Sequence, residues 1–194
     1  MNLRPFQAVF PRMDYITSAD HFFSTVKEDY NEYVVSGFFE KSAQEGFFVY
    51  QIQQSDKAFI GLIACVDVHD YINKNILIHE HTLATKEQQQ IHLLLKRNAQ
   101  VKPVLLTYPK NENISKILKS QSEGKEPTIE IHFDQLNETH RFWAIRDGKM
   151  IQKIQKLFKK EVSTCYISDG HHRSSATALM HQRTNEVRFD NLLA

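Results

Sequence analysis

The stretch that decides the fold is Thr164-Cys-Tyr-Ile-Ser-Asp-Gly-His-His-Arg-Ser-Ser-Ala176. Its first residues form a short apolar run typical of a strand, and its last residues continue into a pattern typical of a helix. Between the two, a glycine permits a tight turn. We therefore predict a strand over 164–167, a turn over 168–170 and a helix from His171 to about Arg183.

The start of this predicted helix is suited to binding an anion. The first amides of a helix have no acceptor inside it, and they lie at the positive end of its dipole. Gly170 has no Cβ and would let the backbone approach a ligand closely, while Arg173 could offer a two-pronged guanidinium to the same group. The hydroxyls of Ser174 and Ser175 add donors on the first turn. We therefore predict that the loop binds a phosphate-bearing ligand, with a nucleotide as the first candidate.

The other polar residues of the loop suggest chemistry beside the phosphate. His171 and His172 can donate to phosphate oxygens or transfer protons near neutral pH. Asp169 lies where its carboxylate could hold a Mg²⁺ ion that bridges phosphate oxygens, so it is the predicted metal ligand and, with His172, a candidate catalytic residue. The simpler interpretation is that Asp169 caps the helix and both histidines are solvated. So many adjacent polar groups on one turn favour a functional loop.

A second polar cluster, His79-Glu80-His81-Thr82, follows a predicted short strand over 76–78. Glu80 is a candidate general base, which His79 or His81 could orient. Two histidines one residue apart on an extended segment lie on the same side of the chain, so a zinc site is an alternative, although it needs a third ligand. Plain surface polarity is the third interpretation. The sequence leaves all three open.

The rest of the chain mixes strands joined by turns with strands joined by helices, which predicts an α+β fold with a mixed sheet, hairpins and helical crossovers. Aromatic residues up to residue 46 suggest helical pieces that end at Gly37 and Gly46. We therefore divide the chain into an aromatic-rich N-terminal region, 1–46, and an α+β domain, 47–194. The remaining strands are expected over 47–53, 58–68, 103–108, 128–134 and 142–145. A helix is expected over about 85–99, starting from a capping box at Thr85-Lys86-Glu87-Gln88. Two more helices are expected, one over 111–120 capped by Asn111 and one that follows a cap at Asp147.

Composition and charge exclude several classes of protein. The 194 residues carry a formal net charge of +1 and are 41% hydrophobic and 24% charged, which suits a globular chain. Charge this balanced supports neither a nucleic acid partner nor binding to an acidic membrane surface, so we expect neither. Lysines line one face of the helix after Asp147, either as a solvated face or as a contact for an anionic partner. The chain shows no signal peptide and no membrane span, and both cysteines read as buried thiols, so we predict a cytoplasmic protein of undetermined oligomeric state.

Several stretches of the chain, taken in their order, resemble a known family. They are Phe48-Val49-Tyr50, Gly61-Leu62-Ile63, His79-Glu80-x-Thr82, Lys86-Glu87, Arg97-Asn98-Ala99, Pro103-Val104 and the Asp-Gly-His-His-Arg loop. The family is the bacterial domain of unknown function 1015, whose members often carry a ParB-like regulator label. The resemblance runs from about Phe47 to Leu179. The family usually has an Asp-Arg pair where this chain has Gln88-Gln89-Gln90, an early Pro-Pro-Tyr-Asp segment that is missing here, and more residues after the last helix. The chain could therefore be a fragment that lacks part of the site.

More distantly, the order of the His-Glu, Pro-Val and Asp-Gly-His-His-Arg motifs is similar to the ParB/sulfiredoxin-like superfamily, which includes free-serine kinases. This resemblance implies a ParB/sulfiredoxin-like core, nucleotide phosphates at the loop, and Glu80 as the base that acts on a substrate hydroxyl. Sulfiredoxins have a reactive cysteine where this chain has His171, so their redox chemistry is not expected. No helix-turn-helix signature of the DNA-binding ParB proteins is visible.

Three functions are left open by the sequence. The first is an enzyme, a phosphotransferase or nucleotide hydrolase that uses ATP or another nucleotide with Mg²⁺ and a small hydroxylated substrate or water. The second is a non-enzymatic, nucleotide-sensing regulator, and the third is a structural protein with a vestigial loop. The sequence does not show whether Glu80 and the loop meet in space.

Overall fold

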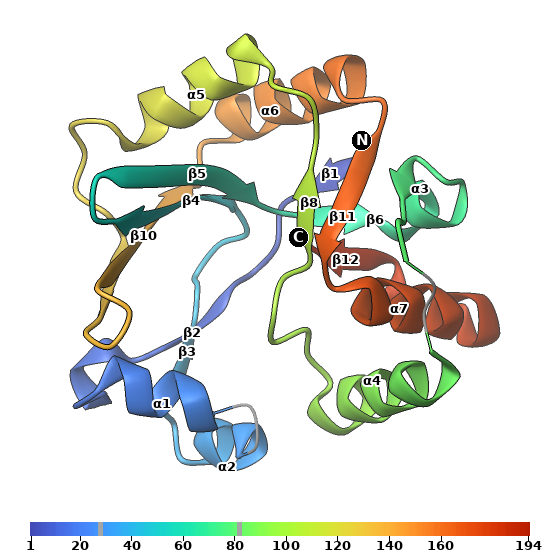
Figure 1. Cartoon of the computed structure of the whole chain (residues 1–194), viewed down its shortest axis with the longest axis horizontal. Coiled ribbons are helices and arrows are strands. Elements are labelled where there is room, and N and C mark those ends of the chain that lie inside the picture. Colours follow the sequence, from blue (N-terminus) through green and yellow to red (C-terminus); the bar gives the residue numbers. More distant parts are fainter. Residues whose placement is uncertain (27–28, 81–82) are drawn as a thin grey trace. The chain divides into compact units, whose positions relative to one another are not determined.

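The computed structural model describes residues 1–26, 29–80 and 83–194 and has several small sheets with helices around them (Figure 1). This confirms the predicted α+β class. Two compact units, which we describe separately, divide the chain. Unit 1 comprises Met1–Arg4, Ile63–Lys116 and Gln152–Ala194, and unit 2 comprises Pro5–Leu62 and Ile117–Ile151. None of the points at which the chain passes between the units coincides with the predicted boundary after residue 46.

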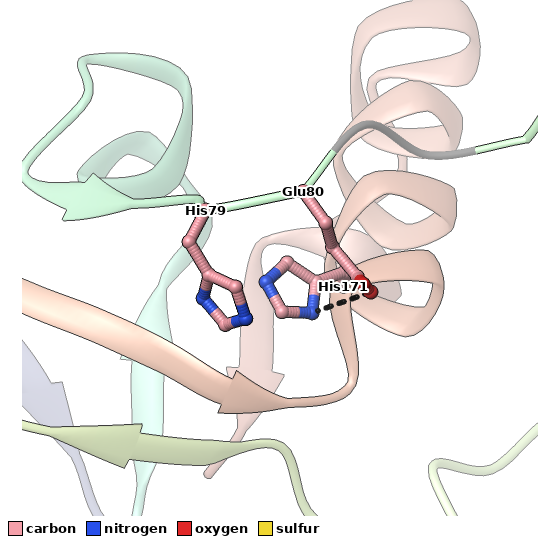
Figure 2. Close-up of side chains that lie close together, drawn as sticks. All are labelled: His79, Glu80 and His171. Atoms are coloured by element: carbon pink, nitrogen blue, oxygen red, sulfur yellow. Dashed lines mark ion pairs between the residues drawn. The ribbon is translucent and has the colours of Figure 1, made fainter.

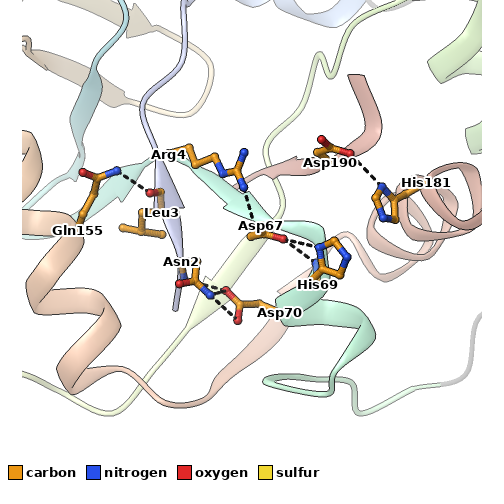
Figure 3. Close-up of polar contacts among 9 residues, drawn as sticks. All are labelled: Asn2, Leu3, Arg4, Asp67, His69, Asp70, Gln155, His181 and Asp190. Atoms are coloured by element: carbon orange, nitrogen blue, oxygen red, sulfur yellow. Dashed lines mark hydrogen bonds and ion pairs between the residues drawn. The ribbon is translucent and has the colours of Figure 1, made fainter. Parts of the chain in front are cut away.

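The first sheet of unit 1 has β6 (Cys65–Asp67) at its centre. This strand pairs antiparallel with β1 (Leu3–Arg4) and with β12 (Asn191–Leu193), so segments from distant parts of the sequence flank one short strand. Polar contacts secure the sheet (Figure 3): the backbone amide of Asn2 donates to Oδ2 of the buried Asp70 over 2.7 Å. A buried carboxylate needs such a donor, since an unpaired charge would be costly there.

The second sheet of unit 1 is mixed, as predicted. Its central strand, β11 (Cys165–Asp169), runs parallel to β7 (Ile76–Leu77) and antiparallel to β8 (Leu105–Thr107). The central strand leads directly into helix α7 (His171–Thr184), which confirms the strand–turn–helix prediction. The strand expected over 103–108 is shorter than predicted, because β8 covers only Leu105–Thr107; it is an edge strand, and Leu105 is 56% exposed.

Helices α4 (Ala84–Arg97) and α7 pack together in unit 1. Their shared core contains apolar side chains from both helices and from the 3-10 helix Val187–Phe189, namely Ile91, Ala176, Met180 and Phe189, with Leu94 and Leu179 against them. The predicted capping box at the start of α4 is wrong. The helix begins at Ala84 after Leu83, which has no capping side chain, so Thr85 lies inside the first turn and is not the cap. The carboxylate of Glu87 accepts from Ser175 on α7.

Two other helix starts were predicted correctly. Asn111 Oδ1 accepts a 3.0 Å bond from the amide of Ile114 at the start of α5 (Glu112–Ser122), and Asp147 Oδ1 accepts a 2.8 Å bond from Met150 in α6 (Gly148–Glu161). The predicted strand over 58–68 is instead divided at Ala64 between two sheets. It ends where Asp67 caps the short helix α3 (Val68–Ile72) by accepting from the amide of His69.

Unit 2 is built on a four-stranded sheet in the order β5-β4-β10-β9. Both predicted hairpins are present, β4 (Phe47–Gln54) with β5 (Lys57–Ile63), and β9 (Ile129–Phe133) with β10 (Glu138–Ile145). A smaller antiparallel pair joins β2 (Val9–Pro11) and β3 (Phe39–Lys41). The short helices between these two strands are Met13–Tyr15 (a 3-10 turn), Ala19–Thr25 (α1) and Tyr30–Val35 (α2). The predicted aromatic packing of this region is present around Phe22, whose ring centroid lies 5.1 Å from that of Tyr33. Gly46 ends no helix and instead forms an antiparallel bridge with Phe6.

Two further sequence predictions were that both cysteines are buried thiols and that the chain has no membrane span. Neither Cys65 nor Cys165 is in a disulfide, and burial raises the pKa of the Cys165 thiol to about 11. Cys65 is only half-buried. Within the ranges that the structure describes, no helix is both long enough and apolar enough to cross a membrane.

Candidate functional site

The two polar motifs of the sequence meet in unit 1. Strands β7 and β11 are parallel neighbours, with Ile76 opposite Cys165, so the segments that follow them leave the sheet at the same edge. As a result, Glu80 Oε1 lies 3.2 Å from Nδ1 of His171, the first residue of α7 (Figure 2). The contact joins the two predicted functional segments, which the sequence alone could not establish.

His171 is the centre of this cluster. Its side chain is only 4% exposed, whereas the Glu80 carboxylate is 57% exposed and open to a ligand from solvent. The ring of His79 lies 4.5 Å away, centroid to centroid, and edge-on to the ring of His171. Figure 2 shows the imidazole of His171 between the side chains of His79 and Glu80. A buried base therefore contacts an exposed carboxylate at the start of a helix.

Two imidazole nitrogens at the start of α7 are buried and have no hydrogen-bond partner among the described residues: Nε2 of His171 and Nδ1 of His172. A buried polar atom without a partner costs free energy, and such atoms are rare in native proteins. A bound water, ion or ligand would remove this cost. Both histidines are therefore better suited to a binding site than to the fully solvated positions of the simpler interpretation.

Arg173 is held by the protein itself. Its Nη1 donates to the carbonyl oxygens of Lys102 and Pro103, each over 2.9 Å, and its Nη2 donates to Asp169 Oδ2 over 2.7 Å. Lys102 Nζ lies 3.3 Å from the same carboxylate oxygen. Burial alone would raise the pKa of Asp169, but Arg173 and Lys102 outweigh it and hold that pKa below its usual value. Asp169 therefore stays ionised and already has two cationic partners.

Gly170 makes room for the Arg173 side chain. It has a φ of 102°, in the left-handed region, and a Cβ at this position would lie 2.8 Å from Arg173 Nη2. The sequence predicted that this glycine lets the backbone approach a ligand. In the structure, the guanidinium of Arg173 occupies the space beside it.

Substitution of Gly170 with Ala is expected to lower the free energy of unfolding by about 1–2 kcal/mol, because an L-residue is strained at this φ and the new methyl group would displace the guanidinium. Gly148→Ala is the matched control, since a Cβ there would meet nothing within 4 Å. Urea denaturation of both variants checks the difference. Equal stability of the two variants would contradict this account of Gly170.

The two serines of the loop point into unit 1. Ser174 is fully buried and its hydroxyl donates to Gly170 O over 3.2 Å. Ser175 is also buried, and its hydroxyl donates to the carboxylate of Glu87. Burial raises the pKa of the neighbouring Tyr71, and the negative charge of Glu87 raises it further. A hydrogen bond with Ser175 acts in the opposite direction but is outweighed. The Ser175 hydroxyl therefore links α7 to α4, while the Ser174 hydroxyl bonds within the first turn of α7, and both donate to acceptors of the protein itself.

Sequence comparison agrees with the motif order. A family model described as "Protein of unknown function (DUF1015)" matches residues 8–191, nearly the whole chain. The chain belongs to the DUF1015 family. No curated protein and no solved structure matches it significantly. The family predicted from the motifs is thus confirmed, and the match begins well before the first motif.

In this DUF1015 protein, one group of side chains could hold a metal ion within the described parts of the chain. One potential ligand atom each from His79, Glu80 and His171 lies within 4.8 Å of the other two. His81 and Thr82 lie outside the described residues, so the structure does not place the predicted pair of His79 and His81. His171 is a further potential ligand, beside His79 and Glu80, that the sequence alone could not identify.

Sequence reasoning missed three residues that contact the candidate site. Lys102 pairs with Asp169, Pro103 accepts from Arg173 through its carbonyl, and Glu87 accepts from Ser175. The order of the matching stretches could have indicated Pro103 and Glu87, since Pro103-Val104 and Lys86-Glu87 belong to the motifs, but Lys102 is in none of them. Nothing in their local sequence shows that they contact α7.

Proposed function

We propose that this DUF1015 protein binds a nucleotide with Mg²⁺ at the start of α7, and that Glu80 accepts a proton during phosphoryl transfer to a small hydroxylated substrate or to water. The observation that carries the proposal is the 3.2 Å contact between Glu80 Oε1 and His171 Nδ1. A carboxylate in contact with an imidazole, and itself open to solvent, is an arrangement suited to general acid–base catalysis. Phosphoryl transfer needs mainly such positioning and charge stabilisation.

The start of α7 supports phosphate binding. The amide of Ser174 donates to Gly170 O over 3.0 Å, and the amides before it have no acceptor within the helix. They lie at the positive end of a 14-residue helix. The ammonium of Lys102, 75% exposed, adds a cation at the same turn. Nδ1 of His172, buried without a partner, is the candidate side chain to contact the ligand.

The roles of Arg173 and Asp169 in the proposal follow from their ion pairs. Arg173 shapes the turn, because its donors are directed to Asp169 and to backbone carbonyls. A Mg²⁺ ion bound by Asp169 would have to compete with both Lys102 and Arg173. We therefore propose that Asp169 pairs with these two cations. The Mg²⁺ ion would instead be bound by the phosphate oxygens of the nucleotide.

The motif order also supports a ParB/sulfiredoxin-like core for the part of the chain that carries β7, β11 and α7. We include this core in the proposal because proteins of that superfamily bind nucleotide phosphates at the equivalent loop. A phosphotransferase is the preferred function, since Glu80 corresponds to the base of the free-serine kinases in the motif His-Glu.

Titration calorimetry with ATP, ADP and CTP in the presence of Mg²⁺ tests the proposal. We expect at least one nucleotide to bind, and Lys102→Ala to weaken its binding about 5–10-fold through loss of one charge-assisted contact. Lys156→Ala, which removes an exposed lysine of α6, is the control and is expected to bind like wild type. Arg173→Ala is a poor probe, because it also removes structural contacts.

The outcomes separate the candidate functions. Binding with turnover supports the enzyme. Binding without turnover of any hydroxylated substrate or water favours the nucleotide-sensing regulator. Absence of binding by the wild-type chain would overturn the proposal and leave a structural role.

A further inference from the structure

We propose that His79, Glu80 and His171 together bind a divalent transition metal ion of the Zn²⁺ class. Their potential ligand atoms lie within 4.8 Å of one another. The three residues come from two elements brought to one edge of the sheet, the segment after β7 and the first turn of α7 (Figure 2). This site goes beyond the proposed function, since no nucleotide is needed to form it.

The buried imidazole of His171 indicates a ligand at this position. One of its nitrogens faces Glu80, and the other, Nε2, is buried without a hydrogen-bond partner among the residues described. Either tautomer of a neutral ring presents one nitrogen lone pair, which is the electron pair that a metal ion takes. An ion shared with Glu80 would bind Nδ1, so Nε2 would carry the ring proton and remain a donor for a water or ligand of its own.

The distances suit a small ion. Zinc lies about 2.0–2.2 Å from nitrogen and oxygen ligands, so two ligands of one tetrahedral ion are about 3.3–3.5 Å apart. The separation of His171 Nδ1 and Glu80 Oε1 is 3.2 Å. His79 and Glu80 are exposed, so their side chains can rotate to close the remaining distance. The buried His171 is the fixed ligand.

The ligand types select the metal. Two imidazoles and one carboxylate match the ligands of catalytic zinc sites, which keep a further position open for water or substrate. Magnesium prefers an octahedron of oxygen ligands and would be a poor match. The ion predicted here is therefore distinct from the Mg²⁺ that accompanies a nucleotide.

A bound ion would change the role of Glu80. A carboxylate that coordinates a metal is no longer a free base, and the metal-bound water, made more acidic by the ion, would be the proton donor or nucleophile instead. The acid–base role of Glu80 thus applies to the metal-free protein. Metal binding and nucleotide binding are measured in separate titrations. A failure of nucleotide binding would therefore not count against the metal site.

The test uses the full chain without a histidine tag, freed of metal with a chelator that is then removed. We expect one equivalent of Co²⁺ to give visible absorption bands typical of four-coordinate cobalt, and Zn²⁺ to abolish them. In calorimetry, Zn²⁺ is expected to bind at least about 100-fold more tightly than Mg²⁺. No saturable binding at one equivalent, or equal affinity for Zn²⁺ and Mg²⁺, would overturn the inference.

Matched variants locate the ion. His79→Ala and Glu80→Gln change exposed side chains and are expected to weaken Zn²⁺ binding at least about tenfold without a change in metal-free melting temperature. His92→Ala, an exposed histidine of α4, and His69→Ala, whose ring contacts His181 (4.9 Å between centroids), are expected to bind like wild type. Loss of binding in His69→Ala but not in His79→Ala would place the ion elsewhere and refute this site.

Discussion

Replacing Glu80 with Gln is expected to lower the rate of phosphoryl transfer by about 10²–10⁴-fold, the usual contribution of a general base. The glutamine has nearly the same shape but cannot accept the proton. Nucleotide affinity is expected to stay within about twofold of wild type, because the proposed phosphate contacts are on α7 and Lys102 and do not include Glu80. The proposal thus predicts a change in turnover that is separate from ligand affinity.

Steady-state turnover and calorimetry of the same preparations measure the two effects of Glu80→Gln. Glu126→Gln is the matched control, since it removes an exposed carboxylate in unit 2. Its turnover is expected to equal that of wild type. If Glu80→Gln kept full activity, Glu80 would be neither a base nor an essential metal ligand, and the contact with His171 would be structural only.

Removal of the Arg173 side chain is expected to have the largest effect on stability among the changes considered. The guanidinium is 20% exposed and is bonded to two backbone carbonyls and to Asp169. Arg173→Ala leaves these groups without their donor, and hydrogen bonds to charged groups contribute about 1.5–3 kcal/mol each without being additive. We expect a loss of about 2–4 kcal/mol in the free energy of unfolding.

Chemical denaturation of Arg173→Ala and Arg173→Lys checks this loss. Lysine keeps the charge but cannot reproduce the planar set of donors, so it is expected to recover only a minor part of the stability. Arg183→Ala, an exposed arginine near the other end of α7, is the control and is expected to change stability by less than about 0.5 kcal/mol. Full stability of Arg173→Ala would show that the guanidinium contacts are dispensable.

The elements predicted best from the sequence are those whose signals are local. The strand–turn–helix at Gly170, the caps at Asn111 and Asp147, and the hairpin of β9 with β10 each depend on a few neighbouring residues. Errors occurred where tertiary contacts decide. Helix α4 begins one residue before Thr85, so Thr85 does not cap it, and Leu105 lies on an edge strand that its apolar sequence did not reveal.

The candidate site was predictable in its residues but not in its internal contacts. His171 and Glu80 were both identified by type and by position after a strand. Their contact, however, depends on the parallel pairing of β7 with β11, which no local pattern encodes. For the same reason the sequence assigned Arg173 and Ser174 to the ligand, whereas the structure bonds them to the protein.

The pairing of β7 with β11 has a consequence for the order of events during synthesis of the chain. Hairpins such as β9 with β10 join neighbouring segments and can form early, since little loop entropy is lost. The sheet of β7, β11 and β8, by contrast, cannot close until β11 has left the ribosome. Until then, the segment that carries Glu80 has no partner strand, so any catalytic competence would arise only after β11 has been synthesised.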